Sequence, residues 1–383
     1  MAKDNGIYLD YAAATPLDPE VFSAMESFYR NNFANPSSMH SAGREVKKYI
    51  EIARTEIGQL LNCSTNEIIF THNGTEANNI ALQGAALSGA KKGKHIVTTR
   101  VEHPSILNTC RYLEKKGYEI TYVGVNERGL VLARDVLEAI RPDTIVVSVI
   151  YAQNEIGTIQ PIQTIGQRLK EKFPDVVFHS DACQAAPYLE LDVKKLRVDL
   201  LTISSSKIYG PKGAALLYKR DDISLTPLLF GGEQEQRLQP GTENAATIIG
   251  LAQSLKKIDR MKKSENVRLQ KLQNVFIKIL QKGLPDIIIN GDLRKRIPNN
   301  IHFSIPGLDS DSLLMLMDQN ELFVSSGSAC KSGDMQPSPT IIALQGEKAD
   351  KAAHVRVTLG RSTTEKDIKQ AATIIQKSVA MLQ

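Results

Sequence analysis

Short apolar runs alternate with amphipathic stretches along the N-terminal part of the chain. The runs are rich in β-branched residues and are bounded by polar or turn-forming residues, so each is expected to be a buried strand. These predicted strands are Ile68–Phe70, His95–Val101, Tyr118–Val125, Thr144–Ala152, Val176–Ser180, Leu200–Ser204 and Ala214–Tyr218. Helical spacing of apolar residues predicts intervening helices, among them Ile106–Lys116, Ala133–Ile140 and Ile162–Phe173.

This alternation of strand and helix predicts an α/β fold. Apolar strands separated by helices are typical of a mostly parallel sheet that helices cover on both faces. In such sheets ligands bind beyond the carboxyl ends of the strands. Polar residues that directly follow the predicted strands are therefore the first candidates for a functional site.

The pattern changes at Ala252–Lys282, where a long charged stretch carries apolar residues at helical spacings. We expect this helix to lead into a second, smaller α+β domain with strands at Asn300–Ser304 and His354–Leu359. A closing helix follows Thr364, and Ser362-Thr363 offer it an N-cap. The expected domains are residues 15–255, which form the large domain, and residues 1–14 with 256–383, which form the small one.

Length, charge and cysteine content exclude several classes of protein. The 383 residues, of which 42% are hydrophobic, suffice for two buried cores. Neither a signal peptide nor an apolar run of membrane-spanning length is found, so the cytoplasm is the expected compartment. The net charge of +5 is scattered, without a nucleic-acid-binding motif. The four cysteines are widely separated, which indicates neither a disulfide framework nor a metal site.

One cysteine and one lysine stand out by their surroundings. Cys330 lies in a stretch of small residues, about 325–340, that suits a mobile loop presenting a thiol. Lys207 lies between a predicted strand and a Gly/Pro turn, as a lysine that forms a Schiff base would. Together they suggest sulfur chemistry on pyridoxal phosphate (PLP). Cys330 taken alone could equally be an inert residue in a turn.

Other candidates follow the strands. Gly74 and Thr75 begin a helix whose free N–H groups suit a phosphate, although the pair alone is an ordinary helix start. Asp181 follows a strand and can hold a pyridinium nitrogen protonated, or can serve as a turn residue. Gln184 can bond the phenolic oxygen of the cofactor. His103 can stack on its ring or relay a proton, or be purely structural.

The chain resembles cysteine desulfurases of the NifS/IscS group, within the fold-type I PLP enzymes. The resemblance covers nearly the whole chain and rests on many motifs in a fixed order. These motifs are 8–15, 35–38, 74–79, 102–104, 154–157, Asp181 with Gln184, 207–213, 240–244, 326–330 and Arg356.

The resemblance implies a role for each matching position. Lys207 would bind PLP and move the α-proton, His103 would stack on the ring, and Cys330 would attack the sulfur of L-cysteine. Arg356 would bind the substrate carboxylate, because a guanidinium pairs with it through two hydrogen bonds. The implied cofactor-binding set is Gly74, Thr75, His103, Asn154, Asp181, Gln184, Ser204, Ser205, Ser206, Lys207 and Thr242, with Asn154 also contacting the substrate.

The implied partners are a second copy of the chain and a sulfur acceptor. Thr242 is expected to reach into the neighbouring subunit's site, which requires a homodimer. A persulfide on Cys330 would pass its sulfur to an iron–sulfur scaffold protein or a tRNA-thiolating enzyme. Whether Cys330 also ligates an iron–sulfur cluster transiently stays open.

Three positions depart from the group's usual pattern. Ser206 replaces the histidine that most relatives have before the lysine, Gln239-Pro240 replaces a segment with arginine, and Lys331 replaces a threonine. We expect these three differences to affect cofactor binding and catalytic efficiency more than the class of reaction. A selenocysteine lyase, a PLP aminotransferase and a degenerate, partner-binding paralogue are the alternatives. An aminotransferase would have no use for the loop around Cys330 and would remain active after Cys330→Ser.

Overall fold

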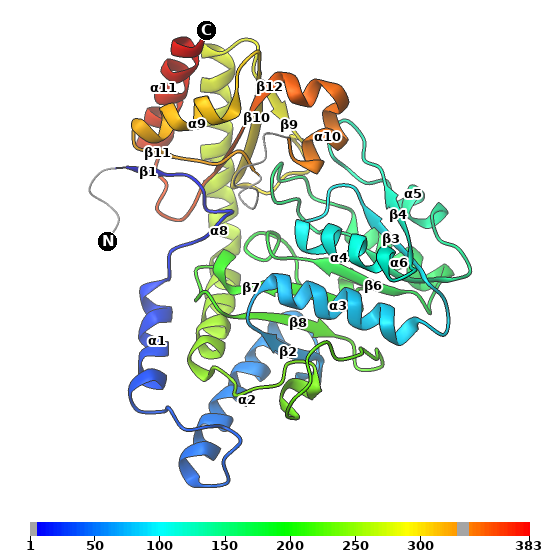
Figure 1. Cartoon of the computed structure of the whole chain (residues 1–383). Helices are drawn as coiled ribbons and strands as arrows, with labels where there is room; N and C mark the ends of the chain where they lie inside the picture. Colours follow the sequence, from blue (N-terminus) through cyan, green and yellow to red (C-terminus); the bar gives the residue numbers. More distant parts are fainter. Residues whose placement is uncertain (1–5, 328–336) are drawn as a thin grey trace.

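The computed structural model describes residues 6–327 and 337–383. A seven-stranded sheet forms the centre of the larger part, in the order β2-β8-β7-β6-β5-β3-β4 (Figure 1). Strand β8 runs antiparallel to both of its neighbours, and all the other pairs are parallel. The strands are β2 (Ile68–Thr71), β3 (His95–Thr99), β4 (Glu119–Val123), β5 (Thr144–Ser148), β6 (Val177–Asp181), β7 (Leu200–Ser204) and β8 (Ala215–Lys219).

The helices of this part are α1 (Pro19–Arg30), α2 (Ser41–Leu61), α3 (Gly74–Gly89), α4 (Pro104–Lys115), α5 (Ala133–Glu138), α6 (Ile162–Lys172) and α7 (Val193–Leu196). Helices α3 to α7 connect strands of this sheet, whereas α1 and α2 precede its first strand and pack against the long helix Ala245–Gly283. Short 3₁₀ turns lie at η1 (Thr65–Glu67), η2 (Ser205–Lys207) and η3 (Gln234–Arg237). The strands and helices expected from the sequence are therefore confirmed, with shifts of a few residues at their ends.

Neighbouring residues of one strand enter different cores, because successive side chains point to opposite faces of a sheet. Ile96 packs in the core cluster that contains α3 and α4, whereas Val97 packs in the larger cluster on the other face. Leu200 and Leu201 divide in the same way. Both faces of the sheet are thus covered, as a mostly parallel sheet requires.

Helix α8 (Ala245–Gly283) runs from the large sheet to a smaller antiparallel sheet of order β12-β10-β9 (Figure 1). The remaining strands are β1 (Ile7–Tyr8), β9 (Ile288–Asn290), β10 (Asn300–Pro306), β11 (Leu322–Phe323) and β12 (Ala352–Thr358). The remaining helices are α9 (Ser310–Gln319), α10 (Pro339–Gln345), η4 (Gly346–Lys351) and α11 (Glu365–Leu382). The domain boundary expected at residue 255 falls inside α8 and stays a prediction.

The cap of the closing helix differs from expectation. Thr364 itself is the N-cap of α11, and its hydroxyl accepts from the backbone N–H of Asp367 at 3.2 Å. The Asp367 carboxylate accepts from the backbone N–H of Thr364 at 2.8 Å, which completes a capping box. No helix in the described part of the chain is long and apolar enough to cross a membrane.

Candidate active site

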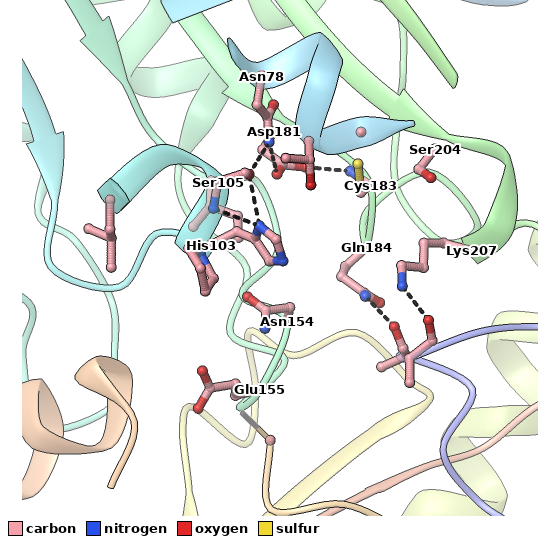
Figure 2. Close-up of a pocket in the computed structure, with 18 of the residues that line it drawn as sticks. Asn78, His103, Ser105, Asn154, Glu155, Asp181, Cys183, Gln184, Ser204 and Lys207 are labelled. Carbon is pink, nitrogen blue, oxygen red and sulfur yellow. Dashed lines mark hydrogen bonds between the residues drawn. The ribbon is translucent and has the colours of Figure 1, made fainter. Parts of the chain in front are cut away.

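A cavity of about 440 Å³ lies at the carboxyl ends of the parallel strands, and residues of the small sheet also line it (Figure 2). Loops after β3 and β5, the ends of β6 and β7, and strand β12 all contribute side chains. Most of the site residues that the sequence singled out line this one cavity. They are Gly74, Thr75, His103, Asn154, Asp181, Gln184, Ser204, Ser206, Lys207 and Arg356.

The start of α3 forms the part of the cavity that suits a phosphate group. Asn73 caps the helix by accepting from the backbone N–H of Glu76 at 2.9 Å. A Cβ atom at Gly74 would lie 2.9 Å from Cys183 Sγ, so a larger residue would crowd the cavity wall. The hydroxyls of Ser204 and Ser206 lie 3.2 Å apart at the end of β7. Free helix N–H groups and two hydroxyls fit an anionic phosphate.

Asp181 is the last residue of β6, and its carboxylate is held by two donors. Asn78 Nδ2 donates to Asp181 Oδ2 at 2.7 Å, and the backbone N–H of Cys183 donates to Asp181 Oδ1 at 2.9 Å. The side chain is buried and borders the cavity. A carboxylate with fixed orientation at this depth suits the ring nitrogen of a pyridine cofactor.

Lys207 lies in η2, immediately after β7. Its Nζ donates to the carbonyl oxygen of Ala13, and Gln184 Nε2 donates to that of Ala12 at 2.9 Å. Burial lowers the pKa of Lys207, which favours the neutral, nucleophilic amine. Tyr209 follows with a φ of 64°, and its backbone N–H donates to Thr15 Oγ1 at 2.8 Å. The N-terminal segment therefore holds the lysine turn in place.

His103 is the N-cap of α4. Its Nδ1 accepts from the backbone N–H of Ser105 at 3.1 Å, and the Ser105 hydroxyl lies 2.8 Å from the same nitrogen. Burial lowers the pKa of His103 below the ordinary value for histidine. The ring borders the cavity between Asn154 and Asp181 (Figure 2).

Arg356 enters the cavity from β12 and is 3% exposed. Its Nη2 forms an ion pair with Asp10 Oδ1 at 2.8 Å, and its Nη1 donates to the carbonyl oxygen of Asn154 at 3.1 Å. The family resemblance implied that Arg356 binds the substrate carboxylate. The structure adds an internal carboxylate, from a residue that the sequence analysis noticed only as part of a motif.

Glu155 is another cavity residue whose side chain the sequence analysis did not single out. The hydroxyl of Ser338 donates to its Oε2, and burial raises the pKa of its carboxyl. Asn78, Ser105 and Cys183 also line the cavity. Each of the three has a polar atom close to Asp181 or His103, which the sequence did identify. These contacts form only when α3, α4 and β6 pack together, so the sequence alone does not indicate them.

Two predicted site residues in the described part of the chain, Ser205 and Thr242, do not line the cavity. Ser205 is fully buried, and its Oγ lies 2.0 Å from where a Cβ atom at Gly210 would be, close to Ser254. Its side chain thus points away from the cavity, because alternate residues at the end of a strand face opposite sides. Thr242 is exposed and borders no part of the cavity in a single chain. Cys330 lies outside the described residues.

The chain is similar to known proteins over nearly its whole length. Residues 7–371 match the family described as aminotransferase class-V. A cysteine desulfurase IscS from Dictyoglomus turgidum is 42% identical over 98% of this chain and 95% of its own length. Another from Clostridium botulinum is 40% identical over 97% of this chain and 94% of its own. The solved structure of a NifS-like protein superposes with a TM-score of 0.91 at 30% identity and covers 98% of this chain and all of its own.

Proposed function

Because the chain belongs to the aminotransferase class-V family, we propose that it is a cysteine desulfurase, which removes sulfur from L-cysteine and releases L-alanine. The observation that carries the proposal is the convergence of Lys207, Asp181, His103 and Arg356 on one cavity. The names of the full-length relatives support the same reaction. A cavity of this kind suits a small amino acid held by its carboxylate.

PLP fits the residues of the cavity. Gly74, Thr75, Ser204 and Ser206 would hold its phosphate, Asp181 its ring nitrogen, and Lys207 its aldehyde carbon. The crowding that a Cβ atom at Gly74 would cause is the observation that favours a closely approached group there. When bound, PLP supplies an electron sink that weakens bonds at the α and β carbons of an amino acid.

Side chains of the protein would bind the substrate, move its α-proton and accept its sulfur. Arg356 would orient L-cysteine through its carboxylate, and Lys207, whose pKa burial lowers, would take the α-proton. Cys330 would then attack the substrate sulfur as a thiolate. An S–S bond forms on Cys330 as the Cβ–S bond breaks, and a proton added at Cβ completes L-alanine.

The persulfide on Cys330 would deliver its sulfur to an acceptor protein that serves iron–sulfur cluster assembly or thiolation of tRNA or cofactors. We further propose a homodimer, in which Thr242 of each chain reaches the other chain's cavity. The three described cysteines are free, as suits a reducing compartment, and we propose the cytoplasm.

The test is the release of alanine and sulfide from L-cysteine by PLP-loaded protein with a reducing thiol. We expect equal yields of both products, loss of both in Cys330→Ser, and wild-type yields in the matched control Cys63→Ser. Protein that binds PLP but releases neither product would overturn the proposal. Amino-group transfer that survives Cys330→Ser would indicate an aminotransferase, and turnover restricted to selenocysteine would indicate a selenocysteine lyase.

A further inference from the structure

A chain of hydrogen bonds joins Asp181 to His103 through two side chains that the proposed reaction does not use. Asn78 Nδ2 donates to Asp181 Oδ2 at 2.7 Å and to Ser105 Oγ at 2.9 Å. Ser105 Oγ lies 2.8 Å from His103 Nδ1 (Figure 2). Asn78 and Ser105 are both buried, so neither bond competes with bulk water.

The direction of each bond follows from its partners. Asn78 must turn its NH₂ group toward Asp181, because its carbonyl oxygen there would face another acceptor. The second hydrogen of that group then points at Ser105 Oγ, which leaves the hydroxyl hydrogen of Ser105 for His103 Nδ1. The backbone N–H of Ser105 also reaches Nδ1 at 3.1 Å and can only donate. His103 Nδ1 is therefore an acceptor of two bonds and carries no proton.

We propose that Asn78 and Ser105 are positioning residues that hold His103 as a neutral imidazole with its proton on Nε2, the nitrogen that faces the cavity. The proposal rests on the proposed function and deepens it. In Figure 2 the second ring nitrogen of His103 points toward the space between Asn154, Gln184 and Lys207. Among the residues that the structure describes, Nε2 has no recorded hydrogen-bond partner.

This arrangement limits what His103 can do during turnover. A neutral ring with its proton on Nε2 donates a hydrogen bond toward the cavity but has no free nitrogen there to accept a proton. The α-proton is thus left to Lys207. Protonation of His103 would place a hydrogen on Nδ1 against two donors and would break the N-cap of α4.

The surrounding charges do not reverse this preference. The charged groups acting on the ring are Asp181 on β6, Lys207 on η2 and Arg356 on β12. Asp181 raises the pKa of His103, but burial is the largest influence and lowers it, and the two cations lower it further. The geometry and the electrostatics agree on a neutral ring near pH 7.

The proposal is tested by the tautomer and the titration of His103 in the PLP-loaded protein. Nitrogen-15 NMR of histidine-labelled protein, with His103→Gln for assignment, is expected to show Nε2 protonated and Nδ1 unprotonated at pH 7. Exchange of the ring C2 hydrogen, followed by mass spectrometry against pH, gives the titration midpoint. Tryptic cleavage isolates His103 in the peptide 101–111, which contains no other histidine.

Two variants remove the donor on Nδ1 in different ways. Ser105→Ala deletes the hydroxyl, and the midpoint is expected to rise by about 0.5 to 1 pH unit, the effect of one neutral hydrogen bond. Asn78→Asp places an oxygen at the position of Nδ2, where it must share one proton with the Asp181 carboxylate and can accept from the Ser105 hydroxyl. That hydroxyl then turns away from Nδ1, so the rise in the midpoint should be larger. The acid limb of the pH profile for alanine release should move upward with the midpoint in both.

Matched controls separate this effect from general disturbance. Ser105→Thr keeps the hydroxyl and should keep the wild-type midpoint. Asn79→Asp makes the same substitution one residue along α3, where Asn79 bonds Thr75, Gln83 and Thr109 instead, and should have a smaller effect than Asn78→Asp. A proton on Nδ1, or midpoints unchanged in both Ser105→Ala and Asn78→Asp, would overturn the proposal. Neither tautomer nor exchange needs turnover, so this failure is distinct from failure of the desulfurase assay.

Discussion

Arg356 has an ion partner before any substrate arrives. Asp10 Oδ1 lies 2.8 Å from its Nη2, and Ser325 Oγ donates to the same carboxylate oxygen at 3.2 Å. A substrate carboxylate must therefore share the guanidinium with Asp10, which a planar fork of five N–H donors permits and a single ammonium does not. Binding of L-cysteine should depend on the shape of this group as well as on its charge.

Arg356→Lys tests that dependence. The charge is retained, but one ammonium cannot pair with two carboxylates in the same geometry, so KM for L-cysteine should rise about tenfold or more. Steady-state kinetics measure the change. Arg296→Lys, a buried substitution in contact with Asp292 and Asn290 and not with the cavity, should leave KM unchanged. Equal KM values in wild type and Arg356→Lys would contradict the proposed role.

Glu102 is a buried carboxyl, and ionising it inside the folded protein costs free energy. Its Oε1 accepts from Thr99 Oγ1 at 2.7 Å and from the backbone N–H of Ile150 at 2.8 Å. Its Oε2 has no partner among the described residues. Burial, the largest cause, raises the pKa of Glu102 to about 8. The folded protein thus keeps this proton to higher pH than the unfolded chain does.

The sign of the resulting pH dependence can be checked with Glu102→Gln. Between the ordinary pKa of about 4.3 and about 8, only the folded state binds the proton, so wild-type stability falls as pH rises through this window. Glutamine has the shape of the protonated acid and lacks this cost. Thermal unfolding at pH 5.5 and pH 8 should show the variant gaining several degrees relative to wild type at the higher pH. A difference that is independent of pH would contradict the assignment.

At the scale of single elements, the strands and the mostly parallel character of the large sheet are predictable, whereas the order of the strands across the sheet and the reversal of β8 are not. The apolar runs predicted the strands of the large sheet because buried parallel strands need continuous apolar sequence. The reversal of β8 follows from the short connection between Ser204 and Ala215, which cannot provide a crossover to a parallel neighbour. The direction of β8 is therefore set by the length of the loop before it and cannot be predicted from the apolar pattern of β8 itself.

Contacts between side chains of distant elements also cannot be predicted from the sequence pattern. Asp10 meets Arg356 across nearly the whole length of the chain, and Asn78 meets Ser105 only because α3 packs against α4. Ser205 and Ser206 are neighbours in sequence, yet only Ser206 borders the cavity. The residue types of the site could thus be predicted from motifs, but the hydrogen-bond partners that orient them depend on packing.

The close packing at the start of α3 predicts how a substitution at Gly74 changes the affinity for PLP. In Gly74→Ala the added Cβ atom would lie 2.9 Å from Cys183 Sγ and 3.4 Å from Ser204 Cβ. The wall beside the phosphate position must then shift, and the dissociation constant for PLP should rise about tenfold or more. Absorbance titration with PLP measures it. Gly124→Ala, where no atom lies within 4 Å, should match wild type, and equal affinities in both variants would exclude this phosphate position.

At the scale of the whole molecule, one chain leaves Thr242 exposed and outside its own cavity. Large apolar side chains are exposed as well, among them Phe230 at 89% and Met39 at 89%. The proposed homodimer would bring Thr242 of each chain to the other chain's cavity.

Thr242→Glu tests the shared site. A carboxylate near the phosphate of PLP in the partner's cavity would repel it, so PLP affinity should fall about tenfold or more while the dimer persists. Absorbance titration and sedimentation measure the two quantities. Thr373→Glu, on the exposed face of α11, adds the same charge elsewhere and should retain wild-type affinity. Full affinity in dimeric Thr242→Glu would contradict the shared site.

Transfer of sulfur to Cys330 is the central claim, and the most direct measurement is the intact mass of the protein after one addition of L-cysteine without a reducing thiol. We predict that the PLP-loaded protein gains one sulfur atom, that peptide mapping places it on Cys330, and that Cys330→Ser gains none. A protein that releases alanine without gaining sulfur, or that carries the sulfur on Cys63, Cys110 or Cys183 instead, would contradict the account.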